Sequence, residues 1–397
     1  MKGHYAVLIS DQQEAKRFME DIGASPAGVE YMAPKGVWRC IKLRHIPDRA
    51  ANIIKQEMLS KGGEAAVAKE ALMSQGTHDV LVMGTLRQFQ RLTEKLRRQP
   101  FGLKVVSQDI ETILANLEKT QWTVQLPYGC SLELGARTKI MGIVNVTPDS
   151  FSDGGRFFNA DQAVEHALEM AADGADIIDI GGASSRPGSQ MVDEDEELAR
   201  IIPVLERLAG EKLILSIDTC RAGVAEAALR AGAHIINDIG GLELDQEMAG
   251  VVCRWQAGLV LMHNRLQIRA DQDYGNFVDD VIMELQQAFD RAQAGGIGQD
   301  RVIIDPGIGF GKTTAQNFTL LKRLHDFRSL GQPILVGASR KGFIGRTLDL
   351  EVGRRVEGSL AAAVMAVVNG ASIVRVHDVM ETKLAVRMAD EMRSADG

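Results

Sequence analysis

The sequence predicts an α/β protein in which a (βα)8 TIM barrel with an N-terminal β-hairpin follows a smaller α/β domain. From Lys139 onward, short β-branched runs alternate with amphipathic helical patterns, as in repeated strand–helix units. A barrel of roughly 250 residues also leaves over a hundred of the 397 residues for another domain. We therefore divide the chain into an accessory domain at 1–120 and a barrel at 121–397.

The strand candidates of the barrel share a short apolar run with a helical pattern after it. They are Lys139–Asn145, Asp176–Gly181, Leu213–Ile217, His234–Asn237, Gly258–Met262, Val302–Asp305, Ile334–Gly337 and Ser372–Val376. An open parallel sheet more often has about five or six strands. Eight such units therefore favour a closed barrel.

A short hairpin pattern precedes the first barrel strand. Trp122–Leu126 and Ser131–Leu134 flank the turn residues Pro127, Tyr128 and Gly129. We expect this hairpin to cap the floor of the barrel.

The first 120 residues mix two kinds of pattern. Strand-like runs lie at Tyr5–Ile9, Val37–Leu43, Asp79–Met83 and Leu103–Val106, and helical patterns lie at Arg49–Ser60, Gly63–Gln75 and Gln88–Arg98. This region carries no phosphate loop, metal cluster or nucleophile constellation in its sequence. A structural or oligomerising role is favoured over a catalytic one.

Composition limits the classes of function. Apolar residues make up 45% and charged residues 25% of the chain, which suits a globular protein with a sizeable core. The formal charge of −8 opposes a nucleic-acid partner. The four cysteines are far apart, which indicates neither disulfides nor zinc and favours a reducing cytoplasm. No apolar stretch reaches 18 residues, so we expect neither a signal peptide nor a membrane span.

Polar residues gather where the predicted strands end, which is where active sites of such barrels lie. They are Asn145 with Thr147 and Asp149; Ser184, Ser185 and Arg186; Asp218; Asn237 and Asp238; His263; Asp305; Ser339, Arg340 and Lys341; and Arg375 with His377. Any one of them could be a helix N-cap. Their joint arrangement indicates an active site at one mouth.

Several motifs at these strand ends resemble those of the dihydropteroate synthases. The run from Met141 to Gly155 reads MGIVNVTPDSFSDGG and is similar to the opening signature of that family. Further similar segments are Asp179–Gly182 through Arg186–Gly188, Ser216–Thr219, Ile236–Asp238, Leu261–His263, Asp305–Lys312, Ser339–Lys341 and Arg375–Asp378. The resemblance runs from about Trp122 to the C-terminus.

One competing motif fails by its spacing. Gly311-Lys312-Thr313 ends like a phosphate-binding Walker A loop. That motif needs a glycine five residues before Gly311, where this chain has Pro306. The glycines here are better explained by a backbone that passes close to a flat ligand.

The resemblance implies a transferase of an alkyl group other than methyl, acting in folate biosynthesis. Such an enzyme condenses (7,8-dihydropterin-6-yl)methyl diphosphate with 4-aminobenzoate to give 7,8-dihydropteroate and pyrophosphate. The matching pterin-binding positions are Asp218, Asn237, Asp305 and Lys341, and of these we regard Asp218, Asp305 and Lys341 as catalytic. An ionised carboxylate near the ring would stabilise the cation that develops as pyrophosphate leaves. The arylamine is neutral at pH 7, so no catalytic base is assigned.

The diphosphate requires positive charge. Arg375 and His377 match the family's anion-binding pair, and their i, i+2 spacing points both side chains the same way. Asn145 matches a Mg2+ ligand that also serves the diphosphate. A single protein ligand is enough, because Mg2+ keeps several waters and bridges phosphates.

The aminobenzoate half of the site is assigned to loops. Ser184, Ser185, Arg186, Pro187 and Ser339 match its positions, although Ala183 stands where a Glu is usual and Ser185 where a Thr is usual. The family is the target of sulfonamides and is commonly homodimeric. We therefore expect a cytoplasmic homodimer that binds these small-molecule substrates, without nucleic acid or membrane partners.

Two other functions share part of this pattern. A pterin-binding methyltransferase acting on a corrinoid protein shares the barrel, but it needs no diphosphate site. A non-catalytic pterin-binding or scaffolding protein would not need the full set of strand-end residues. Both fit the sequence less well than the synthase.

Overall fold

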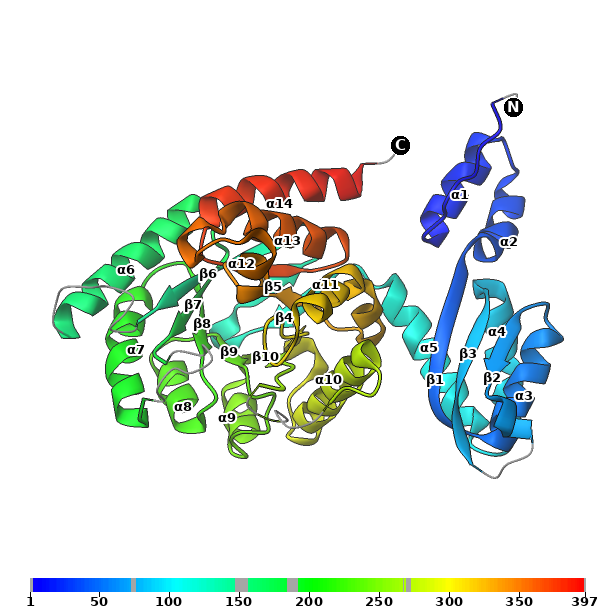
Figure 1. Cartoon of the computed structure of the whole chain (residues 1–397), viewed down its shortest axis with the longest axis horizontal. Coiled ribbons are helices and arrows are strands. Elements are labelled where there is room, and N and C mark those ends of the chain that lie inside the picture. Colours follow the sequence, from blue (N-terminus) through cyan, green and yellow to red (C-terminus); the bar gives the residue numbers. More distant parts are fainter. Residues whose placement is uncertain are drawn as a thin grey trace. The chain divides into compact units, whose positions relative to one another are not determined.

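The computed structural model describes residues 3–72, 76–146, 156–183, 192–266, 268 and 273–395. The chain forms two compact units, divided between Glu118 and Lys119 (Figure 1). Among the described residues, no helix is both long and apolar enough to cross a membrane.

The N-terminal unit is built on a three-stranded antiparallel sheet of order β1-β3-β2. Its strands are β1 (Trp38–Pro47), β2 (Glu64–Val67) and β3 (Thr77–Thr85). Its helices are α1 (Gln12–Asp21), α2 (Pro26–Gly36), α3 (Asp48–Leu59), α4 (Leu86–Leu96) and α5 (Leu103–Glu118), with a 3-10 turn at Lys69–Leu72. Buried residues from β1, β3, α3, α4 and α5 form one apolar core.

Local sequence explains α4 well. Thr85 caps its first turn and forms a capping box with Gln88. Phe89, Leu92 and Leu96 follow at helical spacing and are all fully buried in the core.

Three expectations for this unit were wrong. Leu103–Val106 begins helix α5 rather than a strand, because Leu103, Ser107 and Ile110 bury one helical face that outweighs the β-branched pair between them. Tyr5–Ile9 forms no strand, and Tyr5 is 83% exposed. The pattern at Gly63–Gln75 gives β2 and the 3-10 turn in its described part.

The C-terminal unit is a parallel barrel, with strand order β11-β10-β9-β8-β7-β6-β13-β12. The strands are β6 (Lys139–Asn145), β7 (Ile177–Gly181), β8 (Ile214–Asp218), β9 (Ile235–Asp238), β10 (Gly258–Met262), β11 (Val302–Asp305), β12 (Leu335–Val336) and β13 (Ile373–Val376). A parallel bridge between Ile304 and Ile334 joins β11 to the β12 side and closes the ring. The predicted closed barrel is thus confirmed, with strand bounds that differ by at most one residue.

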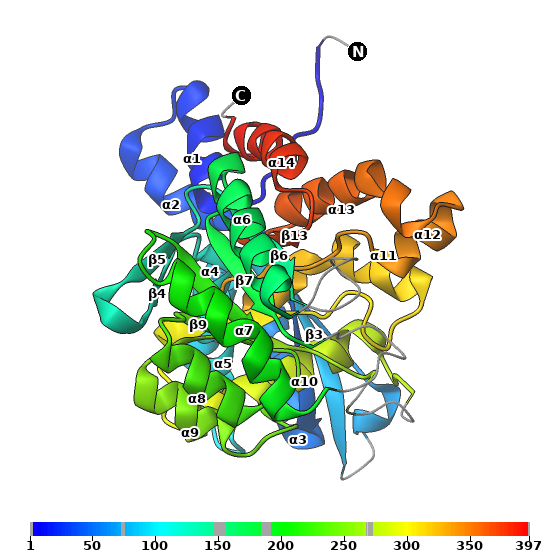
Figure 2. The same cartoon turned by 90° about the vertical axis from the view of Figure 1, so that its left-hand side faces the viewer.

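Helices form the outer layer of this barrel, as Figures 1 and 2 show. They are α6 (Arg156–Asp173), α7 (Glu194–Leu208), α8 (Ala222–Arg230), α9 (Met248–Trp255), α10 (Phe277–Ala294), α11 (Thr314–Lys322), α12 (Gly342–Leu348), α13 (Val356–Val368) and α14 (Val379–Ser394), with 3-10 turns at Pro127–Gly129, Gln299–Arg301, Leu324–Leu330 and Val352–Arg354. A large cluster of buried aliphatic residues fills the space between strands and helices. Burial on both faces explains why the strand sequences are almost continuously apolar.

A separate apolar cluster closes the floor of the barrel. The hairpin strands β4 (Trp122–Gln125) and β5 (Ser131–Leu134) pair antiparallel. Their buried residues Val124, Leu126, Leu132 and Leu134 pack with Met141, Ile177, Ile235, Val260, Ile303, Leu335 and Ile373 from the strands. The hairpin therefore seals the end at which strands such as β7, β9 and β13 begin, and polar side chains can gather at the other end.

Candidate active site

The carboxyl ends of the strands bring together several of the predicted residues. Asp218 ends β8, Asn237 is the residue before the last one of β9, and Asp305 ends β11. Their exposed fractions are only 9%, 3% and 5%. Buried carboxylates and amides need partners, so their contacts define the site.

Arg375 and Asp179 organise one side of this mouth. Nε of Arg375 donates to Oδ2 of Asp179 at 2.6 Å, and Nη2 donates to Oδ2 of Asp218 at 2.8 Å. Nδ2 of Asn237 also donates to Oδ2 of Asp179, at 3.0 Å. One fully buried carboxylate thus orients both the arginine and the asparagine.

The charge on Asp218 depends on opposing effects. Burial raises the pKa of its carboxyl group, Arg375 acts in the opposite direction, and the carboxylates of Asp179 and Glu197 add to the rise. The ion pair with Arg375 therefore decides how far Asp218 stays ionised at neutral pH.

Asp305 is held by the loop that follows β11. The backbone N–H of Gly307 donates to its Oδ1 at 2.7 Å. Burial raises the pKa of Asp305, while Lys341 and that N–H group oppose the rise. Gly307 has φ of +69°, and a Cβ there would lie 1.9 Å from the carbonyl oxygen of His263. Only glycine fits this close approach.

Lys341 lies against the same loop. Its Nζ donates to the carbonyl oxygen of Ile308 and lies 4.6 Å from the centre of the Phe310 ring. Burial lowers the pKa of Lys341 to about 8, with Asp305 opposing that change. The lysine and Asp305 are thus linked through one short segment.

The remaining strand ends carry a serine–histidine pair and an ion pair. Oγ of Ser339 lies 3.0 Å from Nδ1 of His377, and the backbone N–H of His377 donates to the same Oγ at 3.2 Å. Nε of Arg340 donates to Oδ2 of Asp378 at 3.0 Å, so this ion pair joins the segment after β12 to the segment after β13. Asn145 ends β6, which pairs with β13, the strand of Arg375.

Some predicted positions lie outside the described residues. They are Thr147, Asp149, Ser184, Ser185, Arg186 and Pro187. Over the described ranges, no group of three or more His, Cys, Asp or Glu side chains could hold a metal ion by itself.

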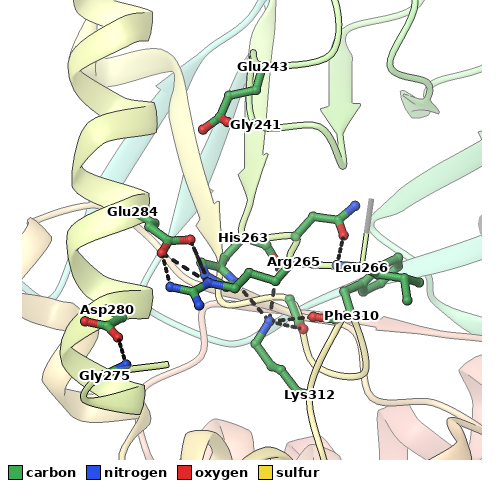
Figure 3. A network of polar contacts seen from close by, with 12 residues as sticks. Gly241, Glu243, His263, Arg265, Leu266, Gly275, Asp280, Glu284, Phe310 and Lys312 are labelled. Carbon is green, nitrogen blue, oxygen red and sulfur yellow. Dashed lines mark hydrogen bonds and ion pairs between the residues drawn. The ribbon is translucent and has the colours of Figure 1, made fainter. Parts of the chain in front are cut away.

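Sequence reasoning gave no role to a further buried network, shown in Figure 3. Lys312, only 8% exposed, places Nζ 2.9 Å from Nδ1 of His263 and donates to the carbonyl oxygens of Gly307 at 2.9 Å and Phe310 at 3.0 Å. Nε2 of His263 lies 3.0 Å from Oε2 of Glu284. The sequence signal that could have indicated this network is Lys312 itself, a lysine at the end of a segment in which glycines alternate with apolar residues.

Arg265 completes this network. Its Nε lies 3.2 Å and 3.3 Å from the two carboxylate oxygens of Glu284, and its guanidinium lies 3.9 Å from the centre of the Tyr274 ring. Burial raises the pKa of Glu284, but the nearby His263 ring and the hydrogen-bonded Arg265 outweigh it and bring the pKa to about 2. Glu284 is therefore a carboxylate at neutral pH.

Comparison with known proteins places this site in a family. The family model described as pterin binding enzyme matches residues 141–377. A dihydropteroate synthase of Clostridium beijerinckii is 45% identical over 259 residues, which are 65% of this chain and 95% of that protein. A probable bifunctional folylpolyglutamate synthase/dihydropteroate synthase of Halobacterium salinarum is 42% identical over 97% of this chain. This chain spans 47% of that longer relative.

Solved structures agree with the fold. A Clostridium difficile dihydropteroate synthase, crystallised in the presence of pteroic acid, superposes with a TM-score of 0.64 at 45% identity, over 66% of this chain and 99% of that one. A Xanthomonas albilineans dihydropteroate synthase with 4-aminobenzoic acid gives a TM-score of 0.65 at 42% identity, over 69% of this chain and 100% of that one.

Proposed function

Because this chain belongs to the pterin-binding enzyme family, with dihydropteroate synthases among its relatives, we propose that its barrel is itself a dihydropteroate synthase. It condenses (7,8-dihydropterin-6-yl)methyl diphosphate with 4-aminobenzoate, yielding 7,8-dihydropteroate and pyrophosphate. The observation that carries this proposal is the buried group of Asp218, Asn237 and Asp305 at the mouth of a barrel that covers nearly the whole of such an enzyme.

The pterin binds among Asp218, Asn237, Asp305 and Lys341. A pterin edge alternates hydrogen-bond donors and acceptors, which buried carboxylates, an amide and an ammonium can satisfy. The burial of the two aspartates and Asn237, and the fixed place of Lys341 on its loop, support this assignment.

The reaction replaces a C–O bond by a C–N bond. The arylamine nitrogen attacks the methylene carbon with its lone pair, the C–O electron pair leaves with pyrophosphate, and the nitrogen then loses a proton. Asp218 and Asp305 stabilise the positive charge that develops on the pterin side. Holding both substrates in line supplies much of the remaining acceleration.

Arg375 and His377 bind the diphosphate. The two contacts that hold Arg375 use its Nε and Nη2, and a guanidinium carries five N–H donors, so others are left for an anion. Oγ of Ser339 lies 3.0 Å from Nδ1 of His377 and so orients the ring at the mouth of the barrel, where an imidazole can bind an anion.

Asn145 is the proposed protein ligand of Mg2+. Its amide oxygen is a hard donor at the end of β6, beside the strand of Arg375, and the donor set suits a metal that takes most ligands from water and phosphate. When bound, Mg2+ would neutralise charge on the leaving diphosphate.

The aminobenzoate site combines Ser339 with the loop residues Ser184, Ser185, Arg186 and Pro187. Ser339 is 7% exposed and hydrogen-bonded to His377, so it joins the two halves of the site. Ala183 in place of the usual Glu is expected to alter the response to sulfonamides.

The protein is proposed to be a cytoplasmic homodimer. Large apolar side chains on α13 and α14 support a self-association face, since Met365, Val368, Met380, Leu384 and Met388 are 47% to 65% exposed. The N-terminal domain is proposed to be accessory to catalysis.

The decisive test mixes the purified full chain with the dihydropterin diphosphate, 4-aminobenzoate and Mg2+. We expect pyrophosphate and dihydropteroate to appear in equal amounts. Absence of turnover at every metal concentration would contradict the proposal. A second preparation lacking the first 118 residues should remain folded and active if the N-terminal unit is accessory.

A further inference from the structure

Lys312 is a buried cation to which the reaction assigns no task. It follows the glycine loop after β11, and all three of its closest polar neighbours are acceptors on the protein. An ammonium group carries three donors, and these neighbours are the carbonyls of Gly307 and Phe310 and Nδ1 of His263. Lys312 is thus satisfied without any contact to a substrate.

The contacts of Lys312 also fix the state of His263. Since the ammonium donates to Nδ1, the proton of a neutral ring must lie on Nε2, which faces Glu284 at 3.0 Å. Burial lowers the pKa of His263 to about 4, with Lys312 acting the same way and Glu284 opposing. The ring is therefore neutral and lies between Lys312 and Glu284, with its Nε2 close to the carboxylate but outside hydrogen-bond geometry.

The Gly307–Gly311 loop, two of whose carbonyls accept hydrogen bonds from Lys312, belongs to neither a strand nor a helix. Gly307, Gly309 and Gly311 all have positive φ, and a Cβ on Gly311 would lie 2.6 Å from the backbone of Arg265. The loop packs closely against the backbone that follows β10, in a conformation that non-glycine residues rarely adopt. Carbonyls turned inward toward one ammonium replace the missing secondary-structure bonds.

This loop supplies hydrogen-bond partners to two of the proposed pterin-binding side chains. The N–H of Gly307 donates to Asp305, and the carbonyl of Ile308 accepts from Lys341. A shift of the loop would move the hydrogen-bond partners of both side chains. Displacements of about 1 Å are enough to impair a polar site.

The electrostatic surroundings explain why a cation is tolerated here. Several charged or titratable side chains surround Lys312. They are Asp305 from β11, Glu284 from α10, Lys341 from the segment after β12, and His263 and Arg265 from the segment after β10. Burial lowers the pKa of Lys312 to about 7, while Asp305 and Glu284 favour the charged form. The two carboxylates act on Lys312 through their charge, while its hydrogen bonds go to His263 and to backbone carbonyls.

We propose that Lys312 and His263 are positioning residues of the pterin site, which fix the Gly307–Gly311 loop so that Asp305 and Lys341 meet the pterin. This inference rests on the proposed function. It predicts that substitution of Lys312 or His263 weakens pterin binding more than binding of 4-aminobenzoate, because neither residue contacts those proposed diphosphate or aminobenzoate residues that the structure describes.

The first test replaces Lys312 by Met, with Lys212→Met as a matched control at an exposed position before β8. Loss of hydrogen bonds from a buried charge should weaken pterin binding about tenfold to a hundredfold. Calorimetry with 6-hydroxymethyl-7,8-dihydropterin measures this without turnover. KM for the dihydropterin diphosphate should rise similarly, and KM for 4-aminobenzoate should change less than about threefold.

A second pair of variants separates positioning from folding. His263→Gln keeps an acceptor for Lys312 and should retain most pterin affinity, whereas His263→Leu should lose it as Lys312→Met does. If Lys312→Met does not fold, as judged by circular dichroism, this pair decides the question. Unchanged pterin affinity in folded Lys312→Met, or equal losses in His263→Gln and His263→Leu, would overturn the inference. A wild-type chain that binds the pterin but makes no product would instead count against the proposed function.

Discussion

Nη2 of Arg375 lies 2.8 Å from Oδ2 of Asp218, so the proposed anion-binding arginine and a proposed pterin-binding aspartate form one ion pair. Substrate binding therefore acts on a shared charge. If the proposed roles hold, binding of the diphosphate to Arg375 is expected to weaken its ion pair with Asp218.

Removing a diphosphate-binding side chain should affect the two pterin ligands differently. His377→Ala is expected to weaken the dihydropterin diphosphate at least about tenfold and the pterin alone by less than about twofold, since a charge-assisted bond is lost only with the anion. Calorimetry with both ligands checks this. Arg375→Ala should follow the same order but with lower stability. Equal losses for both ligands would refute the assignment.

Asp179 should matter for stability as well as for catalysis. Asp179→Ala leaves Arg375 and Asn237 without their common partner in the barrel interior, at an expected cost of about 3–5 kcal/mol. Urea unfolding measures this value. Ser216→Ala is the control, because the buried Oγ of Ser216 has no hydrogen-bond partner among the described residues. That variant should stay within about 1 kcal/mol of the wild type.

The pH dependence of folding should report the neutral ring of His263. Its pKa of about 4 in the folded chain lies below the ordinary histidine value of 6.5, so the unfolded chain binds more protons between these values. Stability should therefore fall as pH decreases through this window. Unfolding of wild type and His263→Gln between pH 6.5 and 5 isolates the effect, before most carboxylates titrate. Parallel curves for the two proteins would be the contrary result.

The backbone at Gly307 should tolerate no side chain. Gly307→Ala combines positive φ with a Cβ 1.9 Å from the carbonyl oxygen of His263, so strain of at least about 1–3 kcal/mol and loss of pterin binding are expected. Thermal unfolding and calorimetry would detect both. Gly210→Ala, where a Cβ would meet nothing within 4 Å, should leave both quantities close to wild type.

The Mg2+ dependence of turnover should change when Asn145 is replaced. Chelation should lower turnover, and Mg2+ should restore it. Asn145→Ala should raise the Mg2+ concentration needed for half-maximal rate about tenfold, while binding of the pterin alone stays the same. A metal response identical to wild type would remove Asn145 from this role.

The barrel was predictable because its pattern is local and repeated. Strands buried on both faces must be short apolar runs, so Gly258–Met262 and Val302–Asp305 were placed to the residue. The N-terminal unit was less predictable, since the β-branched pair Val105 and Val106 indicated a strand where burial of Leu103 and Ile110 on one face gives a helix. There, packing against other elements decides between helix and strand.

The site was predictable where strand ends converge and less so elsewhere. Asp218, Asn237 and Asp305 follow from the barrel geometry, because carboxyl ends meet at one mouth. Asp179 was given no role because it lies inside a strand, and its contact with Arg375 joins residues 196 positions apart. Lys312 belonged to a motif whose phosphate-binding interpretation failed, and its surroundings are seen only from its contacts with His263, Gly307 and Phe310.

The hairpin at the barrel floor has a consequence for where a preceding segment joins the barrel. Since Val124 and Leu132 are buried among the first residues of the strands, the chain enters the barrel at the end away from its polar mouth. A segment that precedes Trp122 is therefore joined to the barrel at its floor, away from the proposed substrate-binding residues. The hairpin thus separates the point at which a preceding domain joins the barrel from the proposed active site.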